Sequence, residues 1–194
     1  MAAVVQTSFI GGLTGQWQID TVASIVGSPL EYAPALEVAE GGAARRDDVA
    51  WTLRGVTSNE RYVNRQERTD LAARQQPLGR PEATRAVLIP IRKSDAWWDL
   101  TQNVRRELFE ARSRHVSIGL TALPEVARRL LHSRDLGEPF DFLTWFEFAP
   151  EHTDRFDAIL EQLRDSEEWK YVDREVEIRL SQRARARAQG RPTR

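Results

Sequence analysis

This sequence of 194 residues contains no cysteine. Disulfides, thiolate metal sites, iron–sulfur clusters and a cysteine nucleophile are therefore excluded. Any metal must be held by histidine, by carboxylate or within a cofactor. Histidine is scarce too: His115, His132 and His152 are the only three, and at least sixteen residues separate each from the next. This spacing gives no local histidine-rich metal motif.

Long apolar runs and the common enzyme motifs are also missing. No stretch approaches the about 20 apolar residues of a membrane-spanning helix, and the N-terminus lacks the basic region and long apolar core of a secretory signal. Glycine-rich phosphate loops, a GxSxG elbow and an HExxH zinc pair are absent from the sequence. We therefore expect a cytoplasmic protein that binds neither membrane nor nucleic acid.

The formal net charge of -1 is unevenly distributed. Residues 183–194 carry five arginines and no acid, and subtracting these charges leaves -6 on the rest of the chain. The Arg, Ala, Gln, Gly and Pro composition of this tail is typical of a disordered, solubilising end, and we assign it no chemistry. The hydrophobic fraction of 41% is sufficient for a real core.

Hydrophobic periodicity predicts both helices and strands. Alternating apolar residues predict strands at 16–27, 47–56, 83–92, 140–148 and 175–180, whereas helical spacing predicts helices at 58–73, 101–115 and 153–168. The stretch at 28–46 is rich in Gly, Pro and Ala and is predicted to be loop. Residues 124–134 have the composition of a helix, but the short turn at 136–139 favours a hairpin strand.

With that hairpin, the second half runs strand, helix, strand, strand, helix, strand, which is the order of a ferredoxin-like unit. We expect an α+β fold of tandem ferredoxin-like units, with a degenerate N-terminal half (1–80) and a ligand-binding C-terminal half (81–182). Antiparallel sheets would carry helices on their outer face, and a curved sheet of this kind can enclose a ligand against a helix.

His115 is the histidine best placed to bind something. It extends the apolar stripe of the predicted helix 101–115 at its C-terminal end, so its imidazole would lie at the edge of the core. Taken alone, a core histidine with satisfied hydrogen bonds is the more common case. His132 is expected to be packed or hydrogen-bonded, and His152 to face solvent near a helix cap. The aromatic residues could be ordinary core or the wall of a flat apolar pocket: Trp97, Trp98, Trp145, Phe146 and Phe148.

Three segments carry a resemblance to a known family. ATRAVLIPIRKSDAWWDLTQ, RHVSIGLTALPEVARRLLHSRDLGEPFDFLTWFEFAPEH and LRDSEEWKYVDREVEIRL strongly resemble the chlorite dismutases, specifically their short, dimeric lineage. The match covers about residues 50–182 in order and without large gaps. The resemblance implies haem b as cofactor, a homodimer, and conversion of chlorite to chloride and dioxygen through a ferryl and hypochlorite intermediate.

The resemblance also implies roles for residues on the proximal side of the haem. His115 matches the axial ligand of the iron. Glu168 matches the carboxylate that accepts the other ring proton of this histidine, and Lys93 the basic residue that completes the network. Trp97 and Trp98, together with Tyr62, match cofactor-binding residues.

On the distal side, Arg128 matches the flexible arginine of the active members of the family. If its segment is a strand, Arg129 must point to the opposite face. Leu123 and Thr144 would line the distal pocket. Gln75, or its neighbour Gln76 if the local alignment slips by one, would anchor Arg128 in one rotamer.

Two other functions compete with chlorite decomposition. The related coproheme decarboxylases depend on a reactive tyrosine in the strand at 83–92, but the tyrosines here are Tyr32, Tyr62 and Tyr171. A non-catalytic haem carrier or sensor would need neither Arg128 nor Glu168. The resemblance therefore favours a haem-dependent chlorite-decomposing enzyme.

Overall fold

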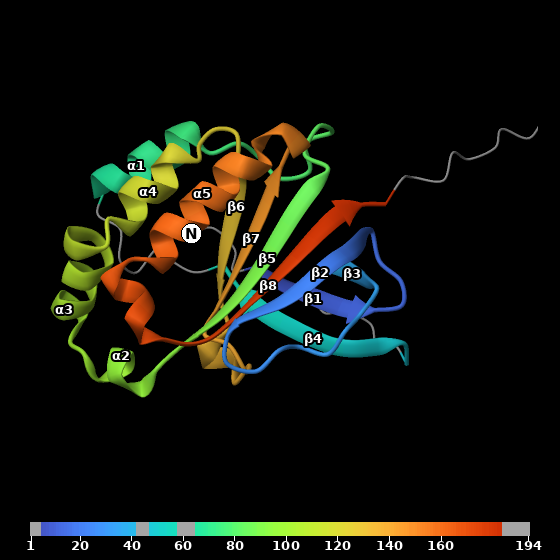
Figure 1. The fold of residues 1–194 in the computed structure, drawn as a ribbon, viewed down its shortest axis with the longest axis horizontal. Coiled ribbons are helices and arrows are strands. Elements are labelled where there is room, and N and C mark those ends of the chain that lie inside the picture. The colour runs from blue at the N-terminus through green and yellow to red at the C-terminus, as the bar shows by residue number, and fades with distance from the viewer. Residues whose placement is uncertain (1–4, 42–46, 58–64, 184–194) are drawn as a thin grey trace, which may run out of the picture.

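The computed structural model describes residues 5–41, 47–57 and 65–183 (Figure 1). Its strands are β1 (Gln6–Gly12), β2 (Trp17–Val26), β3 (Ala35–Glu40), β4 (Val49–Val56), β5 (Arg85–Lys93), β6 (Ala127–His132), β7 (Phe142–Phe148) and β8 (Val172–Gln182). Its α-helices are α1 (Arg65–Arg74), α2 (Asp95–Asp99), α3 (Gln102–Arg106), α4 (His115–Thr121) and α5 (Thr153–Arg164). A π-helix spans Glu107–Arg112, and 3-10 turns span Arg134–Leu136, Pro150–His152 and Glu167–Tyr171. Tyr62 and residues 184–194 of the arginine-rich tail lie outside the described residues.

The strands close into one antiparallel barrel in the order β1-β3-β2-β8-β5-β7-β6-β4. Successive side chains along a strand point to opposite faces, so each strand sends one set of residues inward and another outward. The inward set is mostly apolar and also includes the buried Glu147, which accepts the indole N–H of Trp145. At its centre the ring of Trp145 lies 5.5 Å from the rings of both Phe9 and Trp17. The predicted α+β class is confirmed, and the sheet within it is a closed barrel.

The first half contains two strands that hydrophobic periodicity did not indicate. β1 lies near the N-terminus, and β3 lies inside the stretch predicted to be loop, so that prediction was wrong over Ala35–Glu40. β3 is short and lies between Pro34 and Gly41, so the loop-forming residues around it obscure its alternation of apolar and polar residues. Its Leu36 is fully buried, and the strand is hydrogen-bonded to β1 on one side and β2 on the other. Tertiary pairing therefore decides its structure.

The hairpin at 124–134 is confirmed, since β6 pairs antiparallel with β7. The helical composition of this segment is overridden because Ala127 and Leu131 are fully buried toward the barrel. The opposite face carries Arg128, which lies across from Phe146 in the register.

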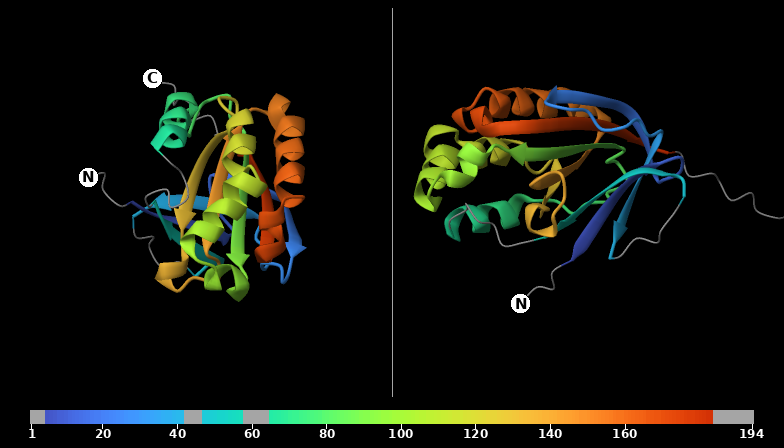
Figure 2. Two further views of the ribbon diagram at one scale, coloured as in Figure 1. Left: turned by 90° about the vertical axis from the view of Figure 1, so that its left-hand side faces the viewer. Right: turned by 90° about the horizontal axis from the view of Figure 1, so that it is seen from below.

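The helices gather on one side of the molecule, away from β1–β4 (Figures 1 and 2). Helix α5 buries the four apolar residues expected of it, Phe156, Ile159, Leu160 and Leu163, against β5, β7 and β8. It is shorter than predicted and ends at Arg164, because Ser166 turns back and donates from both its hydroxyl and its backbone N–H to the carbonyl of Leu163. Within the described residues, no helix combines the length and apolarity needed to cross a membrane.

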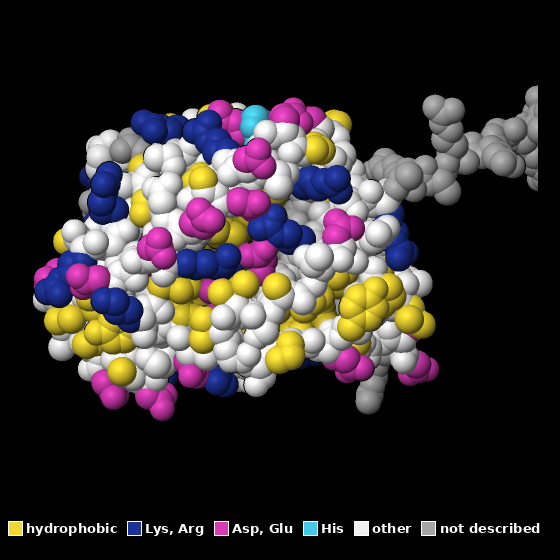
Figure 3. Space-filling model, in the orientation of Figure 1, with side chains coloured by type: hydrophobic (Ala, Val, Ile, Leu, Met, Phe, Trp, Pro, Cys, Tyr) yellow, Lys and Arg dark blue, Asp and Glu magenta, His cyan; other side chains and the backbone are white. Residues whose placement is uncertain are grey.

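Charged side chains of β8 lie between α5 and the sheet. Glu177 accepts hydrogen bonds from Arg164 at 2.7 Å and from Arg179 at 2.5 Å, and the fully buried Glu175 accepts two from Arg164. Burial opposes ionisation of Glu177, but the two arginines outweigh it and hold the pKa of this carboxyl below its usual range. On the face shown in Figure 3, basic and acidic side chains intermingle over the helices, and hydrophobic side chains gather in the lower half of the view.

Candidate functional site

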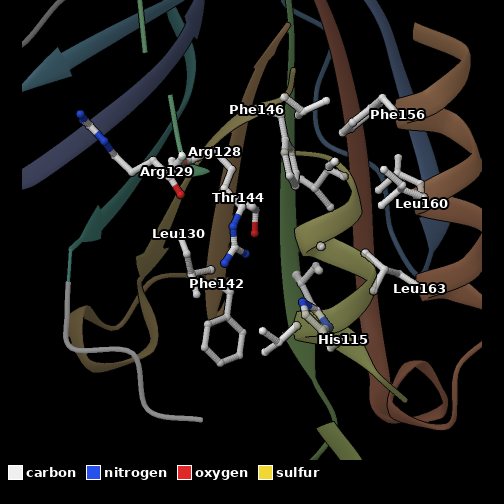
Figure 4. Close-up of a pocket in the computed structure, with 18 of the residues that line it drawn as sticks. His115, Arg128, Arg129, Leu130, Phe142, Thr144, Phe146, Phe156, Leu160 and Leu163 are labelled. Atoms are coloured by element: carbon white, nitrogen blue, oxygen red, sulfur yellow. Dashed lines mark hydrogen bonds between the residues drawn. The ribbon is translucent and has the colours of Figure 1, made fainter. Parts of the chain in front are cut away.

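A cavity of about 580 Å³ lies between the outer face of β5, β7 and β6 and the helices α4 and α5 (Figure 4). Most of its wall is apolar, with side chains that include Ile89, Ile91, Phe142, Phe146, Phe156 and Leu160. His115 lines it from α4, and Arg128 lines it from β6 on the other side. The volume is in the range of small-molecule and cofactor sites, about 300–1,000 Å³.

His115 begins a helix instead of ending one. The helix predicted at 101–115 is confirmed over α3 and the π-helix that continues it to Arg112, but its end was wrong, because the chain turns at Arg114 and α4 starts at His115. Arg114 adopts a left-handed backbone with φ of 53°. The turn contains no proline or glycine, so the sequence carried no signal for it. Val104, an apolar residue of the predicted helix, is exposed.

Two side chains brace this turn. The carboxylate of Glu110, in the π-helix, accepts the backbone N–H of Val116 at 2.7 Å and the hydroxyl of Ser117 at 3.0 Å. The buried hydroxyl of Ser113 accepts the backbone N–H of Glu168 at 2.9 Å. These bonds fix the first turn of α4, and with it the backbone of His115, relative to the turn that carries Glu168. A π-helix segment at a functional position is a recurrent feature.

His115 forms one network with the buried Glu168 and Lys93. Glu168 Oε2 lies 2.7 Å from His115 Nδ1, and Glu168 Oε1 accepts from Lys93 Nζ at 2.7 Å. Burial alone would raise the pKa of Glu168, but the charges and hydrogen bonds of His115 and Lys93 lower it to about 2. A carboxylate at Nδ1 fixes the tautomer with the proton on Nδ1, which leaves Nε2 as an acceptor or metal ligand.

Aromatic rings flank the imidazole. Phe109 stacks on His115 with ring centroids 4.3 Å apart, and Trp169 is nearly parallel to it at 6.5 Å. The indole N–H of Trp169 donates to the buried Glu175 at 2.7 Å, which fixes that ring. The ring plane of His115 is therefore set by stacking as well as by Glu168.

The distal wall follows the register of β6 and β7. Arg128 and Thr144 extend toward the cavity, whereas Arg129 points away and its guanidinium pairs with Glu40 at 2.7 Å (Figure 4). The predicted opposite orientation of the two arginines is thus observed. Gln75 is also brought to this wall, but its amide donates to the backbone carbonyl of Arg128 at 2.7 Å. This bond holds the backbone of the strand at Arg128.

The remaining predicted site residues fall into two groups. Trp97 lines the cavity and lies under Lys93 Nζ, 4.7 Å from its ring centroid. Trp98 lies behind the wall, with its ring stacked on Phe142. The prediction that Leu123 lines the pocket was wrong for this cavity: Leu123 is buried in a cluster with Val116, and of the two only Val116 reaches the cavity wall.

The other histidines and aromatics take different positions. His132 is buried, as expected, packs edge-on against Phe142 and lines the cavity from β6, whereas His152 is half-buried at the N-cap of α5. Of the remaining aromatics, Phe146 lines the cavity, whereas Trp145 lies in the barrel core and Phe148 stacks on Phe156.

Several residues of the site went unrecognised in the sequence. Glu110, Ser113 and Trp169 act on His115 from outside its own helix, and pattern reasoning offers no signal for such contacts. Gly119 also lines the cavity, and its position four residues after His115 in the chain was a signal that could have been used.

The metal-ligating side chains of this site suit a metal ion that is already held within a cofactor. Among the described residues, no group of three or more His, Asp or Glu side chains could hold a bare metal ion. A single imidazole beside a broad apolar cavity instead fits a flat macrocycle whose metal takes Nε2 as an axial ligand. The residues present therefore fit a haem.

Comparison with known proteins agrees with this geometry. A family model described as chlorite dismutase matches residues 38–184. The crystal structure of a dimeric chlorite dismutase from Nitrobacter winogradskyi is 52% identical, with a TM-score of 0.85, and the alignment covers 91% of this chain and 99% of that one.

More distant relatives match at lower identity. A chlorite dismutase from Candidatus Nitrospira defluvii, solved with imidazole, shares the fold at 20% identity, with a TM-score of 0.60 over 91% of both chains. The chlorite dismutase of Ideonella dechloratans is 33% identical over 107 residues, which is 52% of this chain and 34% of that protein. The chain thus matches about a third of the length of that relative.

Proposed function

Because this chain belongs to the chlorite dismutase family, we propose that it is a haem b enzyme that decomposes chlorite to chloride and dioxygen. The observation that carries the proposal is the position of His115. Its Nδ1 is bound to a buried carboxylate, and its ring stands at the wall of an apolar cavity whose other wall carries Arg128. The reaction is redox-neutral overall, since one chlorite ion gives one chloride ion and one dioxygen molecule.

We assign the cofactor to His115, with Glu168 and Lys93 behind it. When bound, haem iron supplies the redox chemistry that breaks the chlorine–oxygen bonds. Glu168 keeps the proton of the imidazole on Nδ1 and directs Nε2 toward the cofactor. A hydrogen bond to this buried carboxylate also makes the imidazole a stronger electron donor. Lys93 balances the charge of Glu168, so that the carboxylate stays ionised.

The substrate-binding role falls to Arg128. A guanidinium in an apolar cavity attracts a small oxyanion strongly, because few waters compete for the charge. Gln75 fixes the backbone from which this side chain extends. Thr144 and Phe142 shape the wall on the neighbouring strand, and the aromatic side chains exclude water from the substrate. Arg128 therefore holds chlorite and its anionic fragment in place until the products form.

The competing decarboxylase function would need a reactive tyrosine on β5. The cavity-facing residues of β5 are Ile89, Ile91 and Lys93, and none of these is a tyrosine. A non-catalytic carrier would have no use for a cation on the distal wall.

We also propose that the barrel is a tandem of ferredoxin-like units, comprising residues 1–80 and 81–182. Support comes from the strand order. The second half is arranged β8-β5-β7-β6, the fourth, first, third and second strands of that half, and the first half repeats this order as β4-β1-β3-β2. The short link between β1 and β2 leaves no room for a crossover helix, so the first half would be the degenerate copy.

The likeness to a dimeric relative at 52% identity supports a homodimer. Light scattering coupled to size exclusion should give twice the mass of 22.2 kDa. Cytoplasmic residence and the lack of nucleic-acid and membrane partners stay predictions from composition.

An oxygen electrode tests the proposed activity. The haem-loaded protein should evolve dioxygen from chlorite, and ion chromatography should find one chloride for each dioxygen. The proposal fails if chlorite only bleaches the haem without releasing dioxygen. Mass spectrometry after addition of coproheme and peroxide would favour decarboxylation if two carboxylates were lost stepwise.

A further inference from the structure

Gly119 has no structural reason to be glycine. It lies inside α4, where glycine weakens a helix relative to alanine. Its φ lies outside the left-handed region, and a Cβ built on it would meet no heavy atom of another element within 4 Å. The protein alone would therefore accept alanine here without strain.

The other described glycines are all explained by the protein itself. Gly27, Gly41, Gly79 and Gly137 have positive φ values, which favour glycine. The remaining ones are close to neighbouring atoms, and a Cβ at any of them would lie 2.2–2.7 Å from its nearest neighbour: Gly11, Gly12, Gly15 and Gly55. Within the part of the chain that the structure describes, Gly119 is the exception.

The open space beside Gly119 is the cavity of the candidate site. Residues four apart in a helix lie on one face, about 6 Å along the axis. His115 and Gly119 have this spacing, and Ala122 continues the face three residues further; all three line the cavity. This face of the helix therefore carries only small residues, Gly119 and Ala122, next to His115. A ring system bound to Nε2 would need this space.

We propose that Gly119 is a cofactor-binding residue whose missing side chain lets the haem macrocycle lie flat against α4. The inference rests on the proposed function, because it assumes that His115 binds a haem. It deepens that function by assigning to Gly119 the clearance that sets how closely the ring approaches the helix. A Cβ at this position would tilt the ring or lengthen the bond to His115, since α4 is held by Glu110 and cannot retreat freely.

The test exploits opposite effects on the empty and the loaded protein. Gly119→Ala should raise the Tm of the haem-free protein by about 2–4 °C, because alanine favours the helix. The same change should weaken haemin binding roughly tenfold. Gly119→Leu, also a good helix former, should weaken haemin binding roughly a hundredfold while the haem-free protein stays folded.

Thr121→Ala is the matched control. Thr121 belongs to the same helix, is exposed and does not line this cavity. This variant should bind haemin like the wild type. Haemin titrations followed at the Soret band, together with thermal unfolding of the haem-free proteins, give both readouts without any assay of turnover.

The outcomes separate the inference from the proposed function. If wild-type protein binds haemin and both Gly119 variants bind it equally well, the role of Gly119 is wrong and the proposed function stands. If wild-type protein binds no haemin, both are overturned. Weaker binding accompanied by a lower Tm for Gly119→Ala would also contradict the inference, because the loss would then reflect a damaged helix.

Discussion

Glu168 is shared between His115 and Lys93, with one carboxylate oxygen 2.7 Å from the imidazole Nδ1 and the other 2.7 Å from the ammonium. The side chain of Glu168 is only 4% exposed, so each partner compensates a charge that burial would otherwise make costly. The orientation of the imidazole and the ionisation of the carboxylate therefore depend on each other.

Replacing this carboxylate should affect both the fold and the cofactor. Glu168→Gln leaves Lys93 buried without its counter-charge, so the free energy of unfolding should fall by about 3–5 kcal/mol. Haemin affinity should fall about 10–100-fold, because the imidazole loses its ionised acceptor. Urea unfolding and haemin titration measure the two effects.

A double variant separates these effects. Glu168→Gln with Lys93→Met removes both charges and should recover much of the stability but not the haemin affinity. Full recovery of affinity in this double variant would mean that Glu168 matters only for folding.

The turn before His115 should depend on Glu110. Glu110→Ala removes two hydrogen bonds to the first turn of α4 and should cost about 1 kcal/mol of stability. Adding Arg114→Gly should restore stability, because glycine accepts the left-handed backbone at this position. Thermal unfolding of the single and double variants measures this.

Glu107→Ala serves as the control for that series. Glu107 is in the same π-helix but pairs with Arg112 at the surface, and its loss should change stability by well under 1 kcal/mol. Equal losses in Glu107→Ala and Glu110→Ala would contradict a bracing role for Glu110.

Arg128 and Arg129 are a natural pair for testing the distal site. Arg128→Ala should bind haemin normally but lower oxygen evolution from chlorite about 100-fold, because the cavity loses the cation that holds the anion. Arg129→Ala breaks only an exposed pair with Glu40 and should keep its activity. Oxygen-electrode traces that lose the same activity in both variants would refute the assignment.

Stability at acid pH should depend on Glu177. Its pKa is lower in the folded protein than the usual value of 4.5, so its ionisation stabilises the fold above that value. This contribution is lost as pH falls through the lowered pKa. The Tm difference between wild type and Glu177→Gln should therefore be full at pH 6 and should shrink as the pH falls below about 4.5. A difference that does not change with pH would contradict this account.

Periodicity predicted the strands and helices whose own residues alternate or repeat. α5 and β7 are examples. Every third or fourth residue of α5 packs on the outside of the barrel, and every second residue of β7 is buried. β3 was not predicted because its pairing with β1 and β2, and not its own residue pattern, determines its structure. The break at Arg114 escaped because no helix-ending residue marks it, and the bonds that stabilise it come from Glu110 and Ser113.

The grouping of residues in the candidate site could be predicted only from the resemblance to a family, and not from residue patterns. His115 lies 53 residues from Glu168, and Lys93 lies 75 from it, so only the resemblance to a family could join them. The resemblance assigned Arg128 to the cavity, and the alternation of side chains along a strand placed Arg129 on the opposite face. The anchoring of the Arg128 side chain by Gln75 stays a prediction, and the contact that the structure shows is with the backbone carbonyl of Arg128.

The most direct test of the account is the absorption spectrum of the protein titrated with haemin. Wild-type protein should give a ferric Soret band that saturates at one haemin per chain, and His115→Ala should lose this band or bind haemin only weakly. His132→Ala, which alters a packed histidine on the opposite wall, should keep the wild-type spectrum. An unchanged Soret band in His115→Ala would contradict the central claim that this histidine holds the haem iron.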